Sequence, residues 1–283
     1  MDGQAAAPAA GTVLNALATG TGSAFAIDEY TTATVELTDE DGVTGEIDGA
    51  EDGDTRLIER CVELVVERFG DGQGGHVETK SEVPMASGLK SSSAAANATV
   101  MATLDALDAT EEISREDAAR IGVTAARDVG VTVTGAFDDA SASMLGGLTV
   151  TNNDEDELLA RDTPDWEVLV WTPPERAFSA DADVERCRQV GPIADVVAGL
   201  ALDGRYGQAM TINGLAFCAA LGFPTEPMME AMATEGVSLS GTGPSFVAVS
   251  TSEQLDPVRE RWEQREGTVW LTHTQTEGTL TDV

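Results

Sequence analysis

The sequence predicts two domains built from mixed helices and strands, in the α+β or α/β class. The first observation is the length of 283 residues, because a domain usually contains roughly 100–200 residues. The second is that strand-like and helix-like patterns occur in both halves of the chain. The third is an acidic, loop-like run at residues 152–165, which is the expected boundary. We therefore expect an N-terminal domain at residues 1–151 and a C-terminal domain at residues 152–283.

The N-terminal half is expected to begin with strands and to continue mainly in helices. Alternating apolar residues predict a strand at 31–37, and the Asp41-Gly42 turn predicts that 43–47 is its hairpin partner. Three serine hydroxyls are expected to cap a long helix that begins at Ser91. The expected elements are strands at 31–37 and 43–47, a helix at 55–69, a strand around Val77, helices at 91–109 and 115–128, and a strand at 148–151.

The C-terminal half is expected to combine strands with more numerous helices. Apolar runs bounded by turn residues predict its strands, and apolar residues spaced three and four apart predict its helices. The strands are predicted at 168–171, 246–250 and 269–272, and the helices at 193–202, 208–220, 226–233 and 254–265.

The charge of the chain is strongly negative. Fifty acidic residues against 16 basic ones give a net charge of −34, and the only two lysines are Lys80 and Lys90. Such a chain has no basic face with which to neutralise nucleic-acid phosphates or an anionic membrane surface, so we expect neither partner. Acidic residues spread along the whole chain instead indicate adaptation to a salt-rich cytoplasm, where screening weakens their mutual repulsion.

The three cysteines are too few and too widely spaced for a disulfide framework or a zinc site. They favour a reducing, cytoplasmic location. The small apolar segment at 5–27 lacks the positive start of a secretory signal, and no uncharged apolar run of about 18 residues predicts a membrane span.

Acidic residues are absent from four long windows, at 3–27, 83–104, 204–225 and 236–252. The window at 204–225 has the apolar spacing of a buried helix, which explains it without a ligand. The windows at 83–104 and 236–252 are rich in Gly, Ser and Thr, and a region that accepts an anionic ligand would exclude carboxylates.

The segment at 84–96 joins a predicted strand to the long helix through a glycine, a lysine and three serines. Backbone N–H groups at a helix N-terminus bind anions, and small residues let a phosphate approach them. The spacing is not that of a Walker A loop. The alternative, an ordinary capped helix after a polar loop, is left open by these residues alone.

Two further segments carry candidate chemistry. Asp138 and Asp139 lie in a stretch that is otherwise free of acidic residues, and they could hold a metal, or one of them could accept a proton from a hydroxyl. The alternative is an Asx turn and an N-cap before Ala140. Residues 238–245 form a second glycine-rich turn before a strand, which could equally be a simple hairpin.

Together these segments resemble the three signatures of the GHMP kinases, in the same order. Residues 7–11 (APAAG) are similar to the first motif, residues 84–95 to the phosphate loop, and residues 239–245 to the third motif. The resemblance covers nearly the whole chain. It implies an α+β fold with an N-terminal ribosomal-protein-S5-like domain and a C-terminal ferredoxin-like domain.

Within that superfamily the segments GLKSSSAAANA and TGAFDDASAS are most similar to the archaeal type of shikimate kinase, and the acidic composition fits a haloarchaeal member. The resemblance implies ATP-dependent phosphorylation of the 3-hydroxyl of shikimate with Mg²⁺. Asp138 and Lys90 are the implied catalytic residues, with Asp138, Asp139, Gly241, Thr242 and Gly243 toward the substrate and Ser92 on the metal. The implied nucleotide site comprises Pro84, Met85, Ala86, Ser87, Gly88, Leu89, Lys90, Ser91, Ser92, Ser93 and Ala94.

The chain departs from the family pattern in two places. Relatives with a lysine–aspartate pair carry the lysine just after the first motif, where this chain has Gly11 and Thr12. The upstream acidic metal ligand of some relatives has only Asp128 as a counterpart, about one residue out of place. Arg127 and Arg176 are unassigned candidates for binding the acceptor carboxylate.

Two alternatives remain at this stage: another GHMP kinase, homoserine kinase first, or a nucleotide-binding module without turnover. A serine hydrolase is poorly supported, because no G-x-S-x-G motif occurs and His76 and His273 lie far apart, as surface residues would. The sequence does not predict the oligomeric state.

Overall fold

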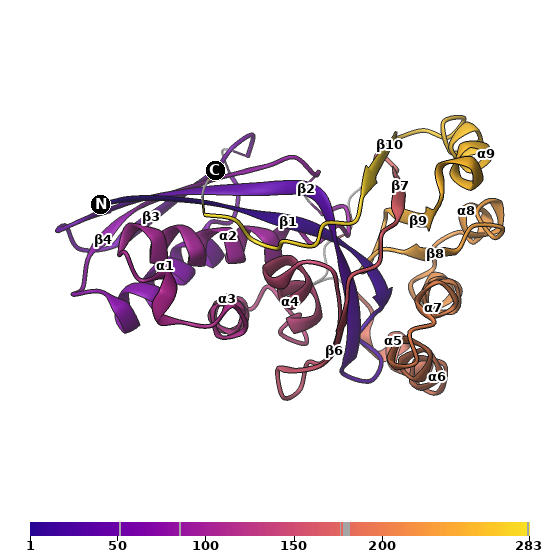
Figure 1. The fold of residues 1–283 in the computed structure, drawn as a ribbon, viewed down its shortest axis with the longest axis horizontal. Helices are drawn as coiled ribbons and strands as arrows, with labels where there is room; N and C mark the ends of the chain where they lie inside the picture. Colours follow the sequence, from indigo (N-terminus) through magenta and orange to yellow (C-terminus); the bar gives the residue numbers. More distant parts are fainter. Residues whose placement is uncertain (51, 85, 176, 178–181, 282) are drawn as a thin grey trace.

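The computed structural model describes residues 1–50, 52–84, 86–175, 177, 182–281 and 283. Within these residues the chain forms two β-sheets, each covered by helices, and the two long strands β1 (Asp2–Leu14) and β2 (Thr21–Thr38) run through the first sheet (Figure 1). Residues 5–27, which were not expected to be a secretory signal, therefore lie mostly in the two long strands of this sheet. No helix in the described ranges is both long and apolar enough to cross a membrane.

The first sheet is organised around β2, which pairs with β1, β4 and β5 along different parts of its length. Its strand order is β3-β4-β2-β5-β6, with β1 also on β2. The remaining bounds are β3 Val43–Ile47, β4 Gly74–Ser81, β5 Leu148–Asn152 and β6 Glu157–Asp162.

The predicted hairpin between 31–37 and 43–47 is wrong. Both segments are strands, but β4 occupies the edge of β2, with Thr31 opposite Ser81 and Thr38 opposite Gly74. β3 therefore pairs in parallel with the outer edge of β4. The local turn signal carries no information about a distant strand that competes for the same edge.

Helices cover one face of the first sheet (Figure 1). α2 and α4 pack on β1 and β2, α1 packs on β3 and β4, and α3 packs on the other helices, in a core made mainly of Ala, Val, Leu and Ile side chains. The predicted helices at 55–69, 91–109 and 115–128 are confirmed within a few residues, whereas a fourth helix at the carboxylate pair was not predicted. The bounds are α1 Arg56–Phe69, α2 Ser91–Ala106, the short 3₁₀ helix η1 Thr110–Glu112, α3 Arg115–Val129 and α4 Phe137–Leu145.

The second sheet has the order β10-β7-β9-β8 and is antiparallel. Alternate residues of β7 and β9, such as Val168 and Val249, pack against Phe25 and Ile27 of β2, so the two sheets share one apolar core. The predicted elements of this half are present, with α8 shorter than expected and α5 and β8 unpredicted. The bounds are β7 Glu167–Thr172, α5 Val184–Gln189, α6 Gly191–Leu202, α7 Tyr206–Leu221, α8 Glu226–Glu230, β8 Gly236–Leu239, β9 Phe246–Ser250, α9 Ser252–Trp262 and β10 Thr268–His273.

The predicted boundary loop at 152–165 contains β6, which pairs with β5 and so extends the first sheet. Its residues alternate between exposed and half-buried, and their high acidity made them look like a loop. The division into domains at 151 and 152 stays a prediction. After β10 the chain returns to the first sheet and ends beside β1 (Figure 1).

Candidate active site

The phosphate-loop segment leads into α2 through three backbone positions in the left-handed region, the first of which is Ala86 with φ +56°. Gly88 has φ +84° and Lys90 has φ +65°. Lys90 is the N-cap residue of α2, and its side chain makes no capping hydrogen bond; the predicted serine cap is therefore wrong. The first N–H groups of a helix lack intrahelical partners, and the first turn of α2 contains no acidic residue. Within the described residues no acceptor pairs with the N–H groups of Ser91, Ser92 and Ser93, so this helix end can accept an anion; the Ser92 side chain is exposed beside it.

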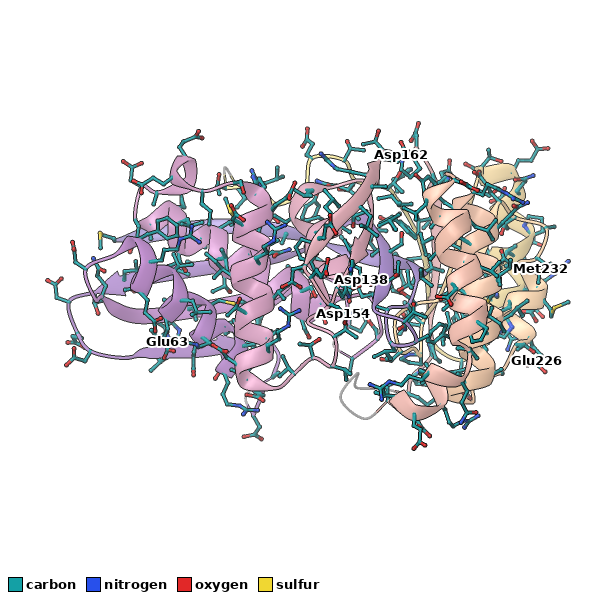
Figure 2. The ribbon with its side chains drawn as sticks, turned by 90° about the horizontal axis from the view of Figure 1, so that it is seen from below. Glu63, Asp138, Asp154, Asp162, Glu226 and Met232 are labelled. Atoms are coloured by element: carbon teal, nitrogen blue, oxygen red, sulfur yellow. The ribbon has the colours of Figure 1, made fainter. Side chains whose placement is uncertain are left out.

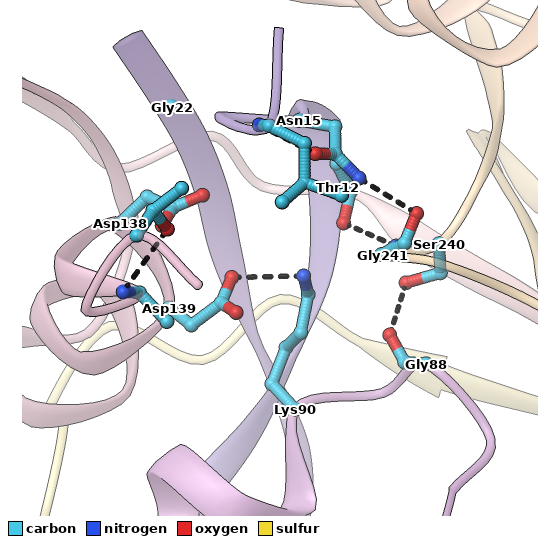
Figure 3. A network of polar contacts seen from close by, with 12 residues as sticks. Thr12, Asn15, Gly22, Gly88, Lys90, Asp138, Asp139, Ser240 and Gly241 are labelled. Atoms are coloured by element: carbon cyan, nitrogen blue, oxygen red, sulfur yellow. Dashed lines mark hydrogen bonds and ion pairs between the residues drawn. The ribbon is translucent and has the colours of Figure 1, made fainter. Parts of the chain in front are cut away.

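The three glycine- and alanine-rich motifs, far apart in sequence, meet at this loop. Ser240 Oγ donates a 2.8 Å hydrogen bond to the carbonyl oxygen of Gly88, and the Ala10 N–H donates to Leu89 O at 3.2 Å. A Cβ on Gly88 would lie 2.3 Å from Ser240 O, so only glycine lets the phosphate loop and the third motif approach this closely. The motifs are thus in direct contact, and Figure 3 shows the bond from Ser240 to Gly88.

Gly241 of the third motif is held through both of its backbone polar groups. Its N–H donates to Thr12 Oγ1 at 2.8 Å, and its carbonyl accepts from Asn15 Nδ2 at 2.9 Å. A Cβ at Gly241 would lie 3.1 Å from Lys90 Nζ. Glycine at this position therefore leaves room for the lysine ammonium.

Lys90 and Asp139 form an ion pair in the middle of these motifs (Figure 3). Lys90 Nζ lies 2.9 Å from Asp139 Oδ1, and the two side chains are only 10% and 14% exposed. Such shielding makes an ion pair stronger than one at the surface, and losing one partner leaves the other charge uncompensated. Lys90 thus places a positive charge beside the carboxylates, whereas the first motif of this chain contains no lysine that could do so.

Asp138 lies deeper than its neighbour. Its Oδ1 accepts a 2.7 Å hydrogen bond from Asn153 Nδ2, and it sits against the backbone of Gly22, where a Cβ would lie 2.5 Å from Oδ2. Burial raises the pKa of the Asp138 carboxyl to about 7, with a further rise from the charge of Asp139, while Lys90 and Asn153 act in the opposite direction. Asp138 lies near the middle of the molecule in Figure 2, whereas the exposed Glu63 and Glu226 lie at its periphery.

Helix α4 places both carboxylates, because they occupy its first turn. The chain enters α4 through left-handed backbone at Gly135 and Ala136. Asn97 of α2 donates from Nδ2 to Ala140 O at 2.9 Å, which fixes α4 to α2. This buried polar contact therefore helps to set α2 and the carboxylates of α4 relative to each other.

Several predicted residues lie elsewhere or serve another purpose. Asp128 pairs with Arg60 at 2.9 Å, away from the carboxylate pair. Arg127 makes two bonds to Asp156, of 2.6 and 2.8 Å, and donates a third of 3.1 Å to the carbonyl oxygen of Asn153, whose side chain bonds Asp138. Leu89 is a buried core residue, and the exposure of His76 and His273 confirms them as surface groups. Met85 and Arg176 lie outside the described residues.

The remaining predicted residues surround the convergence point. Pro84, Ala86 and Ser87 precede Gly88, whereas Ser91, Ser93 and Ala94 belong to the first turn of α2. Gly243 O would lie 2.8 Å from a Cβ on Gly88, and the buried Thr242 lies between the two glycines of its motif.

Four residues of the site were not predicted: Thr12, Asn15, Gly22 and Asn153. Thr12 and Asn15 follow the first motif within an acid-free window, which was the available signal. Gly22 lies in the same window, but its role and that of Asn153 depend on where α4 docks, which no local pattern shows.

Comparison with known proteins identifies the family. A model described as the N-terminal domain of GHMP kinases matches residues 56–147. A shikimate kinase of Halobacterium salinarum is 64% identical, over 99% of this chain and 100% of that protein. A shikimate kinase of Methanosarcina mazei is 51% identical, over 93% of this chain and 90% of that protein.

Solved structures confirm the fold. The homoserine kinase of Cytophaga hutchinsonii has a TM-score of 0.78 at 17% identity, covering 99% of this chain and 96% of that one. Lactococcus lactis galactokinase, complexed with galactose, has a TM-score of 0.72 at 13% identity, covering 99% of this chain and 95% of that one. At such identities the likeness concerns the fold alone. The expected GHMP kinase fold is confirmed, and by its full-length similarity the chain belongs to the shikimate kinase family of the GHMP kinases.

Proposed function

We propose that the chain transfers the γ-phosphoryl group of ATP to the 3-hydroxyl of shikimate, forming shikimate 3-phosphate and ADP. The observation that carries the proposal is the shielded Lys90–Asp139 ion pair beside the open N-terminus of α2. The carboxylate of the ion pair can accept a proton from a reacting hydroxyl, and the N-terminus of α2 can bind a polyphosphate. The name shared by relatives that are 51–64% identical supports shikimate as the acceptor.

The N-terminus of α2 is the proposed phosphate site. The N–H groups of Ser91, Ser92 and Ser93 point along a helix dipole whose positive end faces the loop. Positive φ at Gly88 and Lys90 turns the chain so that the loop curves around this end. Phosphoryl transfer depends mainly on positioning and charge stabilisation, and this geometry provides both.

The residues present suit Mg²⁺ bound mainly through the nucleotide. The described part of the chain has no cluster of three His, Cys, Asp or Glu residues, as a dedicated metal cage would require. Mg²⁺ in kinases keeps several waters and takes few protein ligands, so the exposed Ser92 hydroxyl is a sufficient protein ligand in this proposal. When bound, the ion would neutralise charge on the phosphates.

The two carboxylates have different proposed roles. Asp139 is partly exposed and paired with Lys90, so we place the acceptor hydroxyl at its free oxygen. Asp138 is buried behind it, and a carboxyl with a pKa of about 7 can take up a proton near neutral pH. The sequence-based prediction that Asp138 is a catalytic residue is kept in this proposal, with Asp138 as the group that can take up the proton.

A coupled ADP-release assay in molar KCl tests the proposal. Turnover is expected with shikimate and not with homoserine, mevalonate or galactose. Asp139→Asn, which keeps the size of the side chain, should abolish turnover while ATP binding persists. Turnover with homoserine but not shikimate would refute the acceptor assignment. ATP binding without turnover on any acceptor would instead favour a nucleotide-binding module.

We place the protein in the cytoplasm. All three cysteines, Cys61, Cys187 and Cys218, are unpaired and buried, as expected in a reducing compartment. The proposed partners are ATP and shikimate alone, with no nucleic acid or membrane.

A further inference from the structure

The segment that follows β10 returns from the second sheet to the first. We call residues 274–281 the C-terminal strap. It runs beside β1 in Figure 1, and Ala6 and Leu280 exchange two backbone hydrogen bonds of 2.8 Å. Gln275, Gly278 and Thr279 of the strap are buried. Burial of this kind distinguishes the strap from a loose chain end.

The strap rests on Gly146 and Gly147, the glycine pair downstream of the two aspartates. The Gly147 N–H donates to Gln275 O at 2.7 Å. A Cβ on Gly146 would lie 2.5 Å from Gly278 N, and a Cβ on Gly278 would lie 2.2 Å from Met144 O. The backbone of the strap therefore packs directly on the backbone at the end of α4. A side chain at Gly146 or Gly278 would collide with the facing backbone, so this contact requires glycine in addition to the positive φ at both positions.

The strap also satisfies the C-terminal end of α4. The last four carbonyl groups of a helix lack intrahelical partners. In α4, Ala142 O accepts from the Gly146 N–H, and Leu145 O accepts from the Arg161 side chain. The other two carbonyls are bonded by Thr279 of the strap. Its Oγ1 donates to Ser143 O and its backbone N–H donates to Met144 O, each at 3.2 Å. One strap residue thus caps half of the open end of α4.

Two further contacts keep Thr279 in place. Gln275 bonds Gly278 twice with its side chain, accepting at Oε1 (2.8 Å) and donating from Nε2 (3.1 Å), and this closes the strap turn. Arg115 of α3 donates to Thr279 O. The turn is consequently fixed both internally and to the helical layer.

We propose that the C-terminal strap is a positioning element of the active site: by capping and seating the C-terminal end of α4, Thr279 and Gly278 fix the height and angle of its first turn. This inference rests on the proposed function, because Asp138 and Asp139 occupy that first turn. α4 has nine residues, so a small displacement at one end moves the carboxylates at the other. The strap itself contacts neither the phosphate loop nor the third motif through any hydrogen bond between described residues.

Two substitutions and a matched control test the strap. Gly278→Ala drives a methyl group into Met144 O, and Thr279→Val removes one capping bond while keeping the shape of the side chain. Thr276→Val makes the same chemical change at an exposed strap position. We expect kcat to fall about tenfold or more in Gly278→Ala and less in Thr279→Val, because small misplacements of catalytic groups are costly. The ATP dissociation constant should stay within about twofold, since the α2 site is untouched.

Hydrogen exchange, followed by mass spectrometry, separates this inference from the proposed reaction. Amides of α4 should exchange faster in Gly278→Ala and Thr279→Val while amides of α2 remain as in the wild type, and Thr276→Val should change neither. Unchanged α4 exchange, or an unchanged kcat with faster exchange, would overturn the positioning role. If the wild-type chain lacks shikimate turnover, the proposed function fails, yet the exchange data still decide whether the strap holds α4.

Discussion

Replacing Asp138 by Asn should make the protein more stable at neutral and alkaline pH. The Asp138 carboxyl has a pKa of about 7 in the folded chain against 3.8 when unperturbed, because it is buried and lies next to Asp139. Below pH 4 it is protonated in both states and makes no difference. Between pH 4 and 7 the folded chain keeps a proton that the unfolded chain releases, so stability falls as the pH rises.

The magnitude follows from the two pKa values. Ionising this carboxyl costs the folded state about 4 kcal/mol at pH 8. Asn has nearly the same shape and can still accept from Asn153 Nδ2, so the variant should retain the buried hydrogen bond. We therefore expect Asp138→Asn to exceed the wild type by up to about 4 kcal/mol at pH 8, with the difference disappearing near pH 4.

Urea unfolding in molar KCl, repeated from pH 4 to pH 8, measures this difference. Asp139→Asn is the matched control, because it leaves the Lys90 ammonium shielded and unpaired and should destabilise the protein at pH 8. If Asp138→Asn is no more stable than the wild type at pH 8, or if the difference does not depend on pH, the burial argument is wrong.

Further variants and conditions test other parts of the account. Lys90→Met removes the charge that lowers the pKa of Asp138, so the acid limb of the pH–rate profile should move to higher pH. An unchanged acid limb would show that Lys90 does not influence the ionisation of the carboxylates. Gly22→Ala places a methyl group 2.5 Å from Asp138 Oδ2 and should reduce kcat about 100-fold, whereas Gly199→Ala in open space on α6 should leave it unchanged. The melting temperature should rise as KCl increases from low to molar concentration, because screening weakens the repulsion of 50 acidic residues; a flat or falling curve would contradict the halophilic interpretation.

The parts of the fold that depend on local patterns could be predicted from the sequence. One-sided apolar spacing located α1 and α7 within a few residues, because each of these helices buries one face against a sheet. Three of the four acid-free windows contain the motifs that meet at Gly88, which is the pattern expected of a region that binds an anion.

The parts that depend on distant segments could not be predicted. The pairing of β3 was wrong because β4 took the edge of β2. The Lys90–Asp139 pair follows from the docking of α4 on α2, for which Asn97 gives no signal in the sequence. The strap and the C-terminal end of α4 are far apart in sequence, with the bonded Ser143 and Thr279 separated by 136 positions, and their contact leaves only a glycine pair as its trace.

Nuclear magnetic resonance of the reaction product tests the central claim most directly. The protein is incubated with ATP, Mg²⁺ and shikimate in molar KCl, and the phosphorus resonance of the product is correlated with the ring protons. The account predicts one new phosphate ester, coupled to the proton at carbon 3, formed in equal amount to ADP. Unmodified shikimate after ATP is consumed, or an ester at another hydroxyl, would contradict it.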